Sequence, residues 1–233
     1  MKIKYILTCL TLAYIIPVNA QDNAYLGNPN GESSIGIYGG INFQNINGKD
    51  ASGDKLSNSL VLRYHIGVNG EIPIAPDFYL QIGLQYISKG TKGEVLYIDN
   101  NGAYSIDREI TMNYVELPLH LKYKPLVGQG HLLVGFGPYV SYCFGGKAAF
   151  SGNSAPNDID LELVKNVPAG SSNNLIYFKR MDVGADFFVG YEFQNGLNFV
   201  LNSQLGLINI NSETSSKLAQ QNTGFGLSIG YRF

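Results

Sequence analysis

Residues 222–233 (NTGFGLSIGYRF) constrain the fold more than any other stretch of the chain. Apolar side chains occupy every second position, and glycine, polar or charged residues stand between them. A period of two is that of a β-strand, whose alternate side chains point to opposite faces of a sheet. One face is therefore apolar along its whole length, and it must be covered either by a second protein layer or by lipid.

The same alternation recurs along the chain and predicts seven further strands. Their ranges are 33–43, 59–74, 78–89, 114–123, 131–144, 178–193 and 197–208. Pro118 interrupts the fourth of them, and because proline cannot donate a ladder hydrogen bond we expect a bulge or bend there. With residues 222–233 the pattern gives about eight strands of similar length.

The connections between these strands alternate between long and short. The short turns are 73–77 (PIAPD), 124–130 and the Asn195-Gly196 hairpin, and the long loops are 44–57, 90–109, 145–177 and 209–221. We expect residues 94–98 to extend their hairpin beyond the barrel. Transmembrane barrels place short turns on the periplasmic side and long loops outside. The sequence thus predicts an all-β, antiparallel up-and-down transmembrane β-barrel, with both ends of residues 33–233 on the periplasmic side.

Aromatic residues fall at the two ends of the predicted strands. At the short-turn end stand Phe78, Tyr123, Tyr191, Phe193, Phe199, Tyr231 and Phe233, and at the long-loop end stand Phe43, Tyr86, Tyr142, Phe144 and Phe225. Aromatic girdles of this kind mark the two interfaces of a lipid bilayer. A soluble lipocalin-like barrel is the structural rival, and it would bury the apolar faces inside.

The N-terminus predicts export. Residues 1–20 combine Lys2 and Lys4, an apolar run too short to span a bilayer, and a small residue before the polar Gln21, which is the layout of a cleaved signal peptide. Residues 21–32 then form a polar, flexible periplasmic leader, and 33–233 the barrel. The formal charge of −2 becomes −2 − 2 = −4 without the signal. No basic run favours nucleic acid, and Cys143 as the remaining cysteine allows no internal disulfide.

The strand register directs ionisable side chains of both signs into the barrel. Reversing it would place each Arg or Lys in lipid at a cost of about 2–4 kcal/mol near the midplane. The candidate lumen network comprises Arg63, Glu71, Glu116, His120, Lys122, Asp182, Asp186, Glu192 and Arg232, and the register adds Lys89 and Arg180. An eight-stranded barrel is just wide enough for its side chains to fill it. A neutralised plug is therefore the leading interpretation, and a solute pathway the alternative.

The same residues give little support for catalysis. Asp182 and Asp186 stand about 13 Å apart along one strand, too far for shared acid-base work. Neither His65 nor His120 has a cysteine partner or another residue at the spacing of metal ligands. Ser141 and Cys143, as possible nucleophiles, have no identifiable base. We therefore expect no catalytic, metal or cofactor site. A barrel enzyme would require Ser141, His65, His120 and Asp182 to converge.

Three stretches resemble a known family. Residues 114–123 (YVELPLHLKY), 205–210 (LGLINI) and 229–233 (IGYRF) are similar to the outer-membrane β-barrel domain family that includes the PorT-like proteins of Gram-negative bacteria, and the architecture resembles the OmpA and OmpX barrels. The resemblance implies an outer-membrane location in contact with lipid, and PorT-like proteins are tied to protein secretion. It carries over no catalytic residue.

Three hypotheses for function follow. The leading one is a non-enzymatic barrel whose outer loops, chiefly 145–177 and 90–109, contact a partner or surface ligand, with a secretion accessory among envelope proteins as the specific version. The alternative is a small-solute porin or channel with a charged lumen. The third is a barrel enzyme acting on lipid or peptide.

Overall fold

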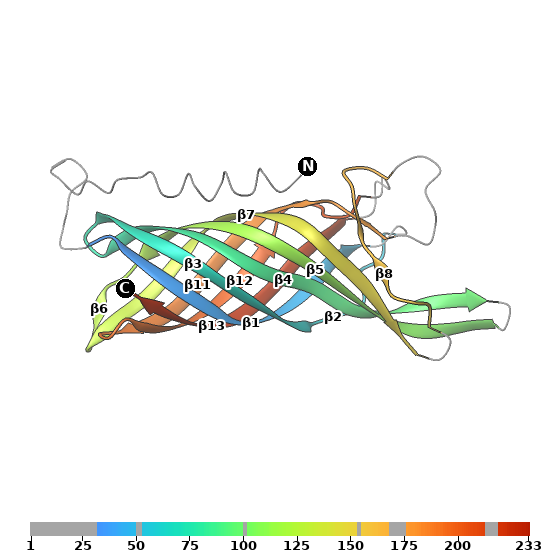
Figure 1. Ribbon diagram of the computed structural model, residues 1–233, viewed down its shortest axis with the longest axis horizontal. Coiled ribbons are helices and arrows are strands. Elements are labelled where there is room, and N and C mark those ends of the chain that lie inside the picture. Colours follow the sequence, from blue (N-terminus) through green and yellow to red (C-terminus); the bar gives the residue numbers. More distant parts are fainter. Residues whose placement is uncertain (1–31, 50–52, 100–101, 153–154, 168–175, 213–218) are drawn as a thin grey trace, which may run out of the picture.

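Eight long antiparallel strands form a closed ring in the computed structural model (Figure 1). The structure describes residues 32–49, 53–99, 102–152, 155–167, 176–212 and 219–233. The ring strands are β1 (Ser34–Lys49), β3 (Val61–Ala75), β4 (Phe78–Asp99), β5 (Gly102–Tyr123), β7 (Gly130–Ser151), β11 (Met181–Phe193), β12 (Leu197–Gly206) and β13 (Ala219–Arg232). Each pairs with its neighbour, and the β7–β11 and β13–β1 ladders close the ring.

The predicted fold class is therefore confirmed: the chain is an all-β, antiparallel, up-and-down barrel. The predicted signal peptide (1–20) lies outside the described residues, as does all of the leader (21–32) except Glu32. Among the residues that the structure describes, none forms an apolar helix of membrane-spanning length.

The two faces of the wall follow the sequence period. On β3, Leu62, Tyr64 and Ile66 are exposed, whereas His65 and Glu71 are buried inside. The other ring strands repeat this arrangement, so that the outer surface carries a continuous apolar band and the interior carries the polar groups. A soluble barrel would bury its apolar side chains in the interior. Because the apolar side chains of this wall point outward, the lipocalin-like alternative does not fit it.

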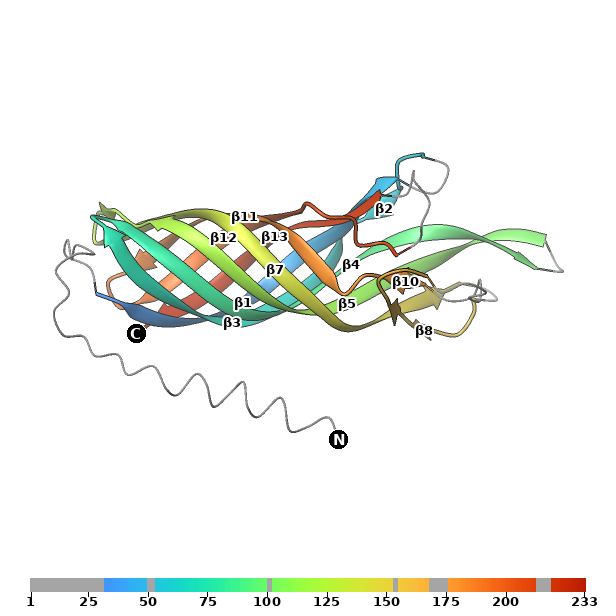
Figure 2. The same cartoon turned by 90° about the horizontal axis from the view of Figure 1, so that it is seen from above.

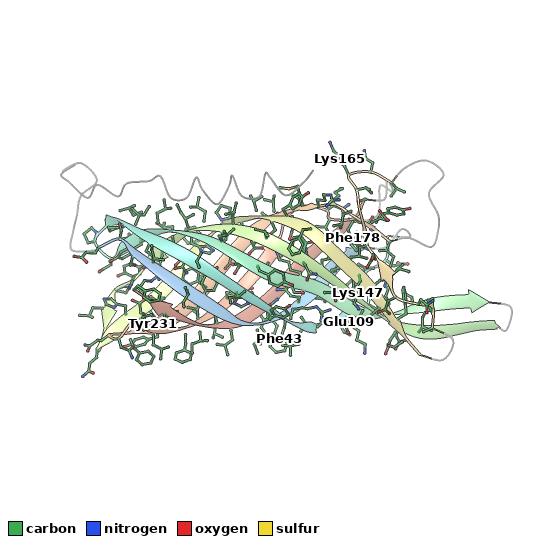
Figure 3. All side chains as sticks on the ribbon, in the orientation of Figure 1. Phe43, Glu109, Lys147, Lys165, Phe178 and Tyr231 are labelled. Atoms are coloured by element: carbon green, nitrogen blue, oxygen red, sulfur yellow. The ribbon has the colours of Figure 1, made fainter. Side chains whose placement is uncertain are left out.

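Aromatic contacts gather at both ends of the apolar band. At the short-turn end the rings of Phe78 and Tyr123 lie 4.8 Å apart and those of Tyr231 and Phe233 lie 5.0 Å apart. Toward the other end the Phe43 and Phe225 rings stack at 5.2 Å. Figure 3 shows Tyr231 and Phe43 at different positions along the barrel. The arrangement is typical of the two interfacial girdles of a membrane barrel.

The short turns form one end of the barrel, where the C-terminus also lies (Figure 1). Between β3 and β4, Pro76 is followed by Asp77 with φ of 61°, a left-handed conformation that Asp adopts more readily than most residues. Between β11 and β12 the Gly196 amide donates to the Phe193 carbonyl at 3.0 Å, and φ of Gly196 is 84°. The hairpin predicted at Asn195-Gly196 is present, although Asn195 keeps a negative φ.

Of the bulge or bend expected at Pro118, the bulge is absent. The β4–β5 register is the same on both sides of Pro118, with Ile82 opposite Leu119 and Gln85 opposite Glu116. Gly83 explains this, since a Cβ on that glycine would come within 2.8 Å of the proline ring. The missing side chain leaves room for the ring, and the ladder is interrupted only over Gly83–Leu84 and Leu117–Pro118 before it resumes in the same register. The register shift of β5 against β7 lies instead between Asn113 and Tyr114.

The long-loop end differs most from the prediction. Within the stretch expected as a loop, residues 90–99 and 102–109 form the continuing arms of β4 and β5. The hairpin extends past the rest of the barrel (Figures 1 and 2), as was expected for residues 94–98 alone. Strand β7 likewise continues to Ser151. Short strands complete the molecule: β2 (Asn58–Ser59) on β4, β8 (Ile159–Asp160) on β7, β9 (Glu162–Leu163) parallel to β10 (Tyr177–Phe178), and β6 (Leu126–Val127) at the opposite end.

Candidate functional site in the barrel interior

A buried lysine holds two carboxylates together in the middle of the barrel. Lys89 Nζ on β4 lies 2.8 Å from Glu116 Oε2 on β5 and 3.1 Å from Asp182 Oδ2 on β11. All three residues are fully buried. The ammonium also lies 4.2 Å from the centre of the Tyr139 ring, within the range of a cation–π contact. These three charged residues are called the middle cluster below.

Neutral side chains satisfy most of the remaining acceptors of the middle cluster. Glu116 accepts hydrogen bonds from Ser141 (2.6 Å), Gln85 (2.6 Å) and Gln204 (2.7 Å). Asp182 accepts one from the Asn222 amide at 3.0 Å. Because these donors come from β4, β7, β12 and β13, the cluster links opposite walls of the barrel. A buried ion pair held in this way is costly to break, since either partner alone would be a charge without compensation.

A second charge network occupies the short-turn end, and we call it the short-turn cluster. Glu71 accepts from Lys122 and Arg232, and Lys124 Nζ lies 3.6 Å from Glu71 and 2.6 Å from Glu192. The side chains of all five residues are at most 11% exposed. Sequence reasoning missed Lys124 because it follows the strand in a turn, where the alternation of faces no longer applies.

Between the two clusters the interior contains a cavity of about 70 Å³. His65, His120, Asp186 and Ser228 are among the side chains that line it. His120 Nε2 lies 3.9 Å from Asp186 Oδ1, and the Gln204 amide donates to Asp186 Oδ2 at 3.1 Å. A space of this size admits only a few water molecules.

Of the residues that a barrel enzyme would require, Ser141 and Asp182 lie opposite each other at the middle cluster, whereas His65 and His120 contact other partners. Ser141 donates to Glu116, and His65 Nε2 lies 2.7 Å from Ser228 Oγ. His65 Nδ1 in turn lies 3.2 Å from Asn42 Oδ1, so that Ser228, His65 and Asn42 have the order of a nucleophile, a base and an orienting amide. His65 and Ser228 line the small cavity between the two charge clusters, where no peptide or lipid headgroup fits.

Two arginines lie away from the clusters. Arg63, on the interior face of β3, pairs with Glu109 at 2.9 Å and donates to Thr111 at 2.8 Å, toward the long-loop end. Arg180, expected to point into the lumen, is exposed instead, with its guanidinium 5.9 Å from the Tyr142 ring. It precedes β11, which begins only at Met181, so the alternation did not apply to it.

Apolar side chains close the interior toward the long-loop end, a feature that the alternating sequence pattern does not predict. We call this group the apolar plug. It combines residues of the ring strands with others from the segments that follow β7 and β12: Ile46, Ile87, Ile110, Met112, Tyr114, Cys143, Ala148, Leu161, Leu163, Phe178 and Ile210. Figure 3 shows Phe178 near that end. Tyr114 also faces Lys89, so the plug rests directly on the middle cluster.

A comparison with known protein families agrees with this architecture. A family model described as the outer membrane protein beta-barrel domain matches residues 19–212. No curated protein matches the chain. Solved structures that match include Ail, the attachment invasion locus protein of Yersinia pestis, in complex with the heparin analogue sucrose octasulfate (14% identity, 87% of this chain and 100% of that chain, TM-score 0.41). The outer membrane protein OprG from Pseudomonas aeruginosa also matches (13% identity, 86% and 96%, TM-score 0.42).

Proposed function

The chain belongs to the outer membrane protein beta-barrel domain family, and we propose that it acts as a non-enzymatic barrel whose long extracellular hairpin contacts a partner protein. Its apolar wall contacts the lipid of the outer membrane. The proposal takes the long-loop end as extracellular, since barrels of this type place their short turns on the periplasmic side.

One observation carries the proposal: the tip of the β4–β5 hairpin has open backbone edges. The β2 ladder on β4 ends with Asn58 opposite Gly93, and the β7 ladder on β5 ends with Ser151 opposite Asp107. Farther out, residues 95–99 and 102–106 pair only with each other within the described part of the chain. Their outward N–H and C=O groups can therefore accept an additional strand, which is a common mode of protein recognition.

The interior supports this proposal over the solute pore. A conducting pathway would have to cross the apolar plug, the middle cluster and the short-turn cluster in turn. The space between the clusters is about 70 Å³, and each charged side chain in the clusters lies within ion-pair distance of one of opposite sign. We place the function on the outer surface for this reason. A secretion-accessory role among envelope proteins is the more specific form of the proposal, and it rests on the resemblance to PorT-like proteins.

Site-specific photocrosslinking tests the proposal at the hairpin. A photoreactive phenylalanine analogue is introduced at Val95 in the hairpin and, as a matched control, at Val127 in a turn at the opposite end. We expect irradiation of intact cells to give a discrete protein adduct from position 95 and none from position 127. The absence of any adduct from folded protein, or the same adducts from both positions, would sink the proposal.

A shortened hairpin provides the second arm of this test. Replacing residues 96–105 by a two-residue Asn-Gly turn removes most of the open edges and keeps the pairing of β4 with β2 and of β5 with β7. We expect this variant to assemble in the outer membrane and to lose its partner. If it keeps the partner at full yield, the contact lies elsewhere on the molecule.

A further inference from the structure

Arg180 is an exposed cation on the outer surface of the barrel. It stands directly before β11 and opposite Cys143 on β7, whose amide donates to the Arg180 carbonyl at 2.6 Å. Its guanidinium carbon lies 5.9 Å from the centre of the Tyr142 ring, and this ring is exposed on the outer face of β7. The side chain therefore turns outward, over an aromatic residue of the girdle, instead of into the lumen.

Strand geometry gives the depth of Arg180 in the membrane. From Met181, the next residue, to Tyr191 in the short-turn girdle, β11 advances by 191 − 181 = 10 residues. At about 3.3 Å per residue and a tilt of about 40°, these residues span about 25 Å along the barrel axis. This is the height of the apolar band of a membrane barrel. Phe144, two residues beyond Tyr142, is also exposed, so Arg180 lies within the girdle, at the level of the lipid headgroups.

The acidic residues of β11 do not neutralise this arginine. Asp182, Asp186 and Glu192 are all buried in the interior, and Asp182 is bound there by Lys89 at 3.1 Å. Within the part of the chain that the structure describes, the Arg180 side chain forms neither an ion pair nor a hydrogen bond. Its contact with the ring leaves the N–H groups of the guanidinium available to an anion.

We propose that Arg180, held over Tyr142, binds a phosphate group of an anionic lipid in the outer leaflet. The N–H groups of a guanidinium match two oxygens of a phosphate, and such charge-assisted pairs are among the stronger hydrogen bonds in proteins. Met181 and Leu207 are exposed beside this position, toward the centre of the apolar band, where the acyl chains of the same lipid would lie. Both the charge and the apolar surface of the site thus fit one lipid molecule.

The depth of the site favours a lipid over a soluble phosphorylated molecule, because a group within the girdle is reached from the membrane. The inference shares with the proposed function only the orientation of the barrel, in which the long-loop end faces outward. It does not depend on the β4–β5 hairpin, so lipid binding and partner crosslinking can fail independently of each other.

Titration with lipid A, a phosphorylated lipid of the outer leaflet, tests the inference. The refolded protein in detergent is mixed with lipid A or with its dephosphorylated form, and bound lipid is measured by native mass spectrometry. Lys49→Gln is the matched control, since Lys49 is an exposed cation six residues (49 − 43 = 6) beyond Phe43 of the girdle, or about 15 Å farther out.

We expect the wild type and Lys49→Gln to bind lipid A equally and to bind the dephosphorylated lipid more weakly. In Arg180→Gln the affinity for lipid A should fall by roughly 10-fold or more, to that for the dephosphorylated lipid. Arg180→Lys should recover part of the loss, because it restores the charge without the paired N–H groups. Arg180 is exposed, so its variants are expected to fold, which the gel shift of the folded barrel checks.

Three results would overturn the inference. The first is equal affinity of the wild type and Arg180→Gln for lipid A. The second is equal affinity of the wild type for both forms of the lipid, which would mean that the acyl chains alone bind. The third is displacement of lipid A by millimolar inorganic phosphate, which would indicate a site for free phosphate.

Discussion

Replacing Lys89 by alanine tests the energetic role of the middle cluster most sharply. The substitution leaves Glu116 and Asp182 buried without the ammonium that lies 2.8 and 3.1 Å from them. Removing one partner of a buried ion pair typically costs about 3–5 kcal/mol. The hydrogen bonds from Ser141, Gln85 and Gln204 remain to Glu116, so we expect the lower half of that range for the loss of unfolding free energy.

Strand β4 also supplies the matched control. Lys92 pairs with Asp107 at 3.3 Å, but both side chains are nearly half exposed. An exposed ion pair contributes at most about 1 kcal/mol, so Lys92→Ala should change stability by less than that. Replacing the whole cluster by neutral residues, with Lys89→Met, Glu116→Gln and Asp182→Asn together, should recover most of the stability that Lys89→Ala loses.

Urea unfolding in phospholipid vesicles measures these differences. The chain has no tryptophan, so far-UV circular dichroism and the gel shift of folded barrels follow the transition. The reasoning is refuted if Lys89→Ala costs no more than Lys92→Ala. It is also refuted if the neutral triple variant is less stable than Lys89→Ala alone.

Three further predictions concern other parts of the barrel. Glu71→Gln removes the negative charge shared by three cations and should cost more than about 2 kcal/mol in the same unfolding assay, since it leaves their positive charges buried with less compensation. Gly83→Ala should cost about 1–3 kcal/mol by crowding the Pro118 ring, and a double-mutant cycle should show a smaller cost in Pro118→Ala. Leu227→Arg on the lipid face should cost about 2–4 kcal/mol in vesicles, whereas Leu126→Arg, in the exposed β6 segment at the end of the barrel, should cost less than about 1 kcal/mol.

The sequence predicted the facing of the wall because side chains in a strand alternate strictly. Every second side chain of each strand had to be apolar because it faces lipid. His65, Glu116 and Asp182 stand at the other positions and could therefore be assigned to the interior from the alternation alone. The alternation says nothing of where a strand ends above the membrane. The pattern therefore predicted a loop at residues 90–109 with a hairpin extension over 94–98 alone, although both arms keep pairing without a break to Asp99 and Gly102.

Contacts that depend on closure of the ring could not be predicted. Lys124 reaches Glu71 and Glu192 from a turn, and Ser228 meets His65 from the far end of the chain. The apolar plug was missed for a related reason, because Leu161 and its neighbours lack any regular period. A sequence pattern assigns faces, and only the register between strands brings particular side chains together.

Planar bilayer recording of the refolded protein tests the central claim most directly, namely that the barrel interior is closed and the function lies on the outer hairpin. It is run beside Arg63→Ala, which breaks the pair with Glu109 at the long-loop end of the interior. Protein shown to be folded by its gel shift should give no conductance steps, with or without the substitution. Reproducible steps in the wild type, altered in size or selectivity by Arg63→Ala, would contradict the account and establish a pathway through the lumen.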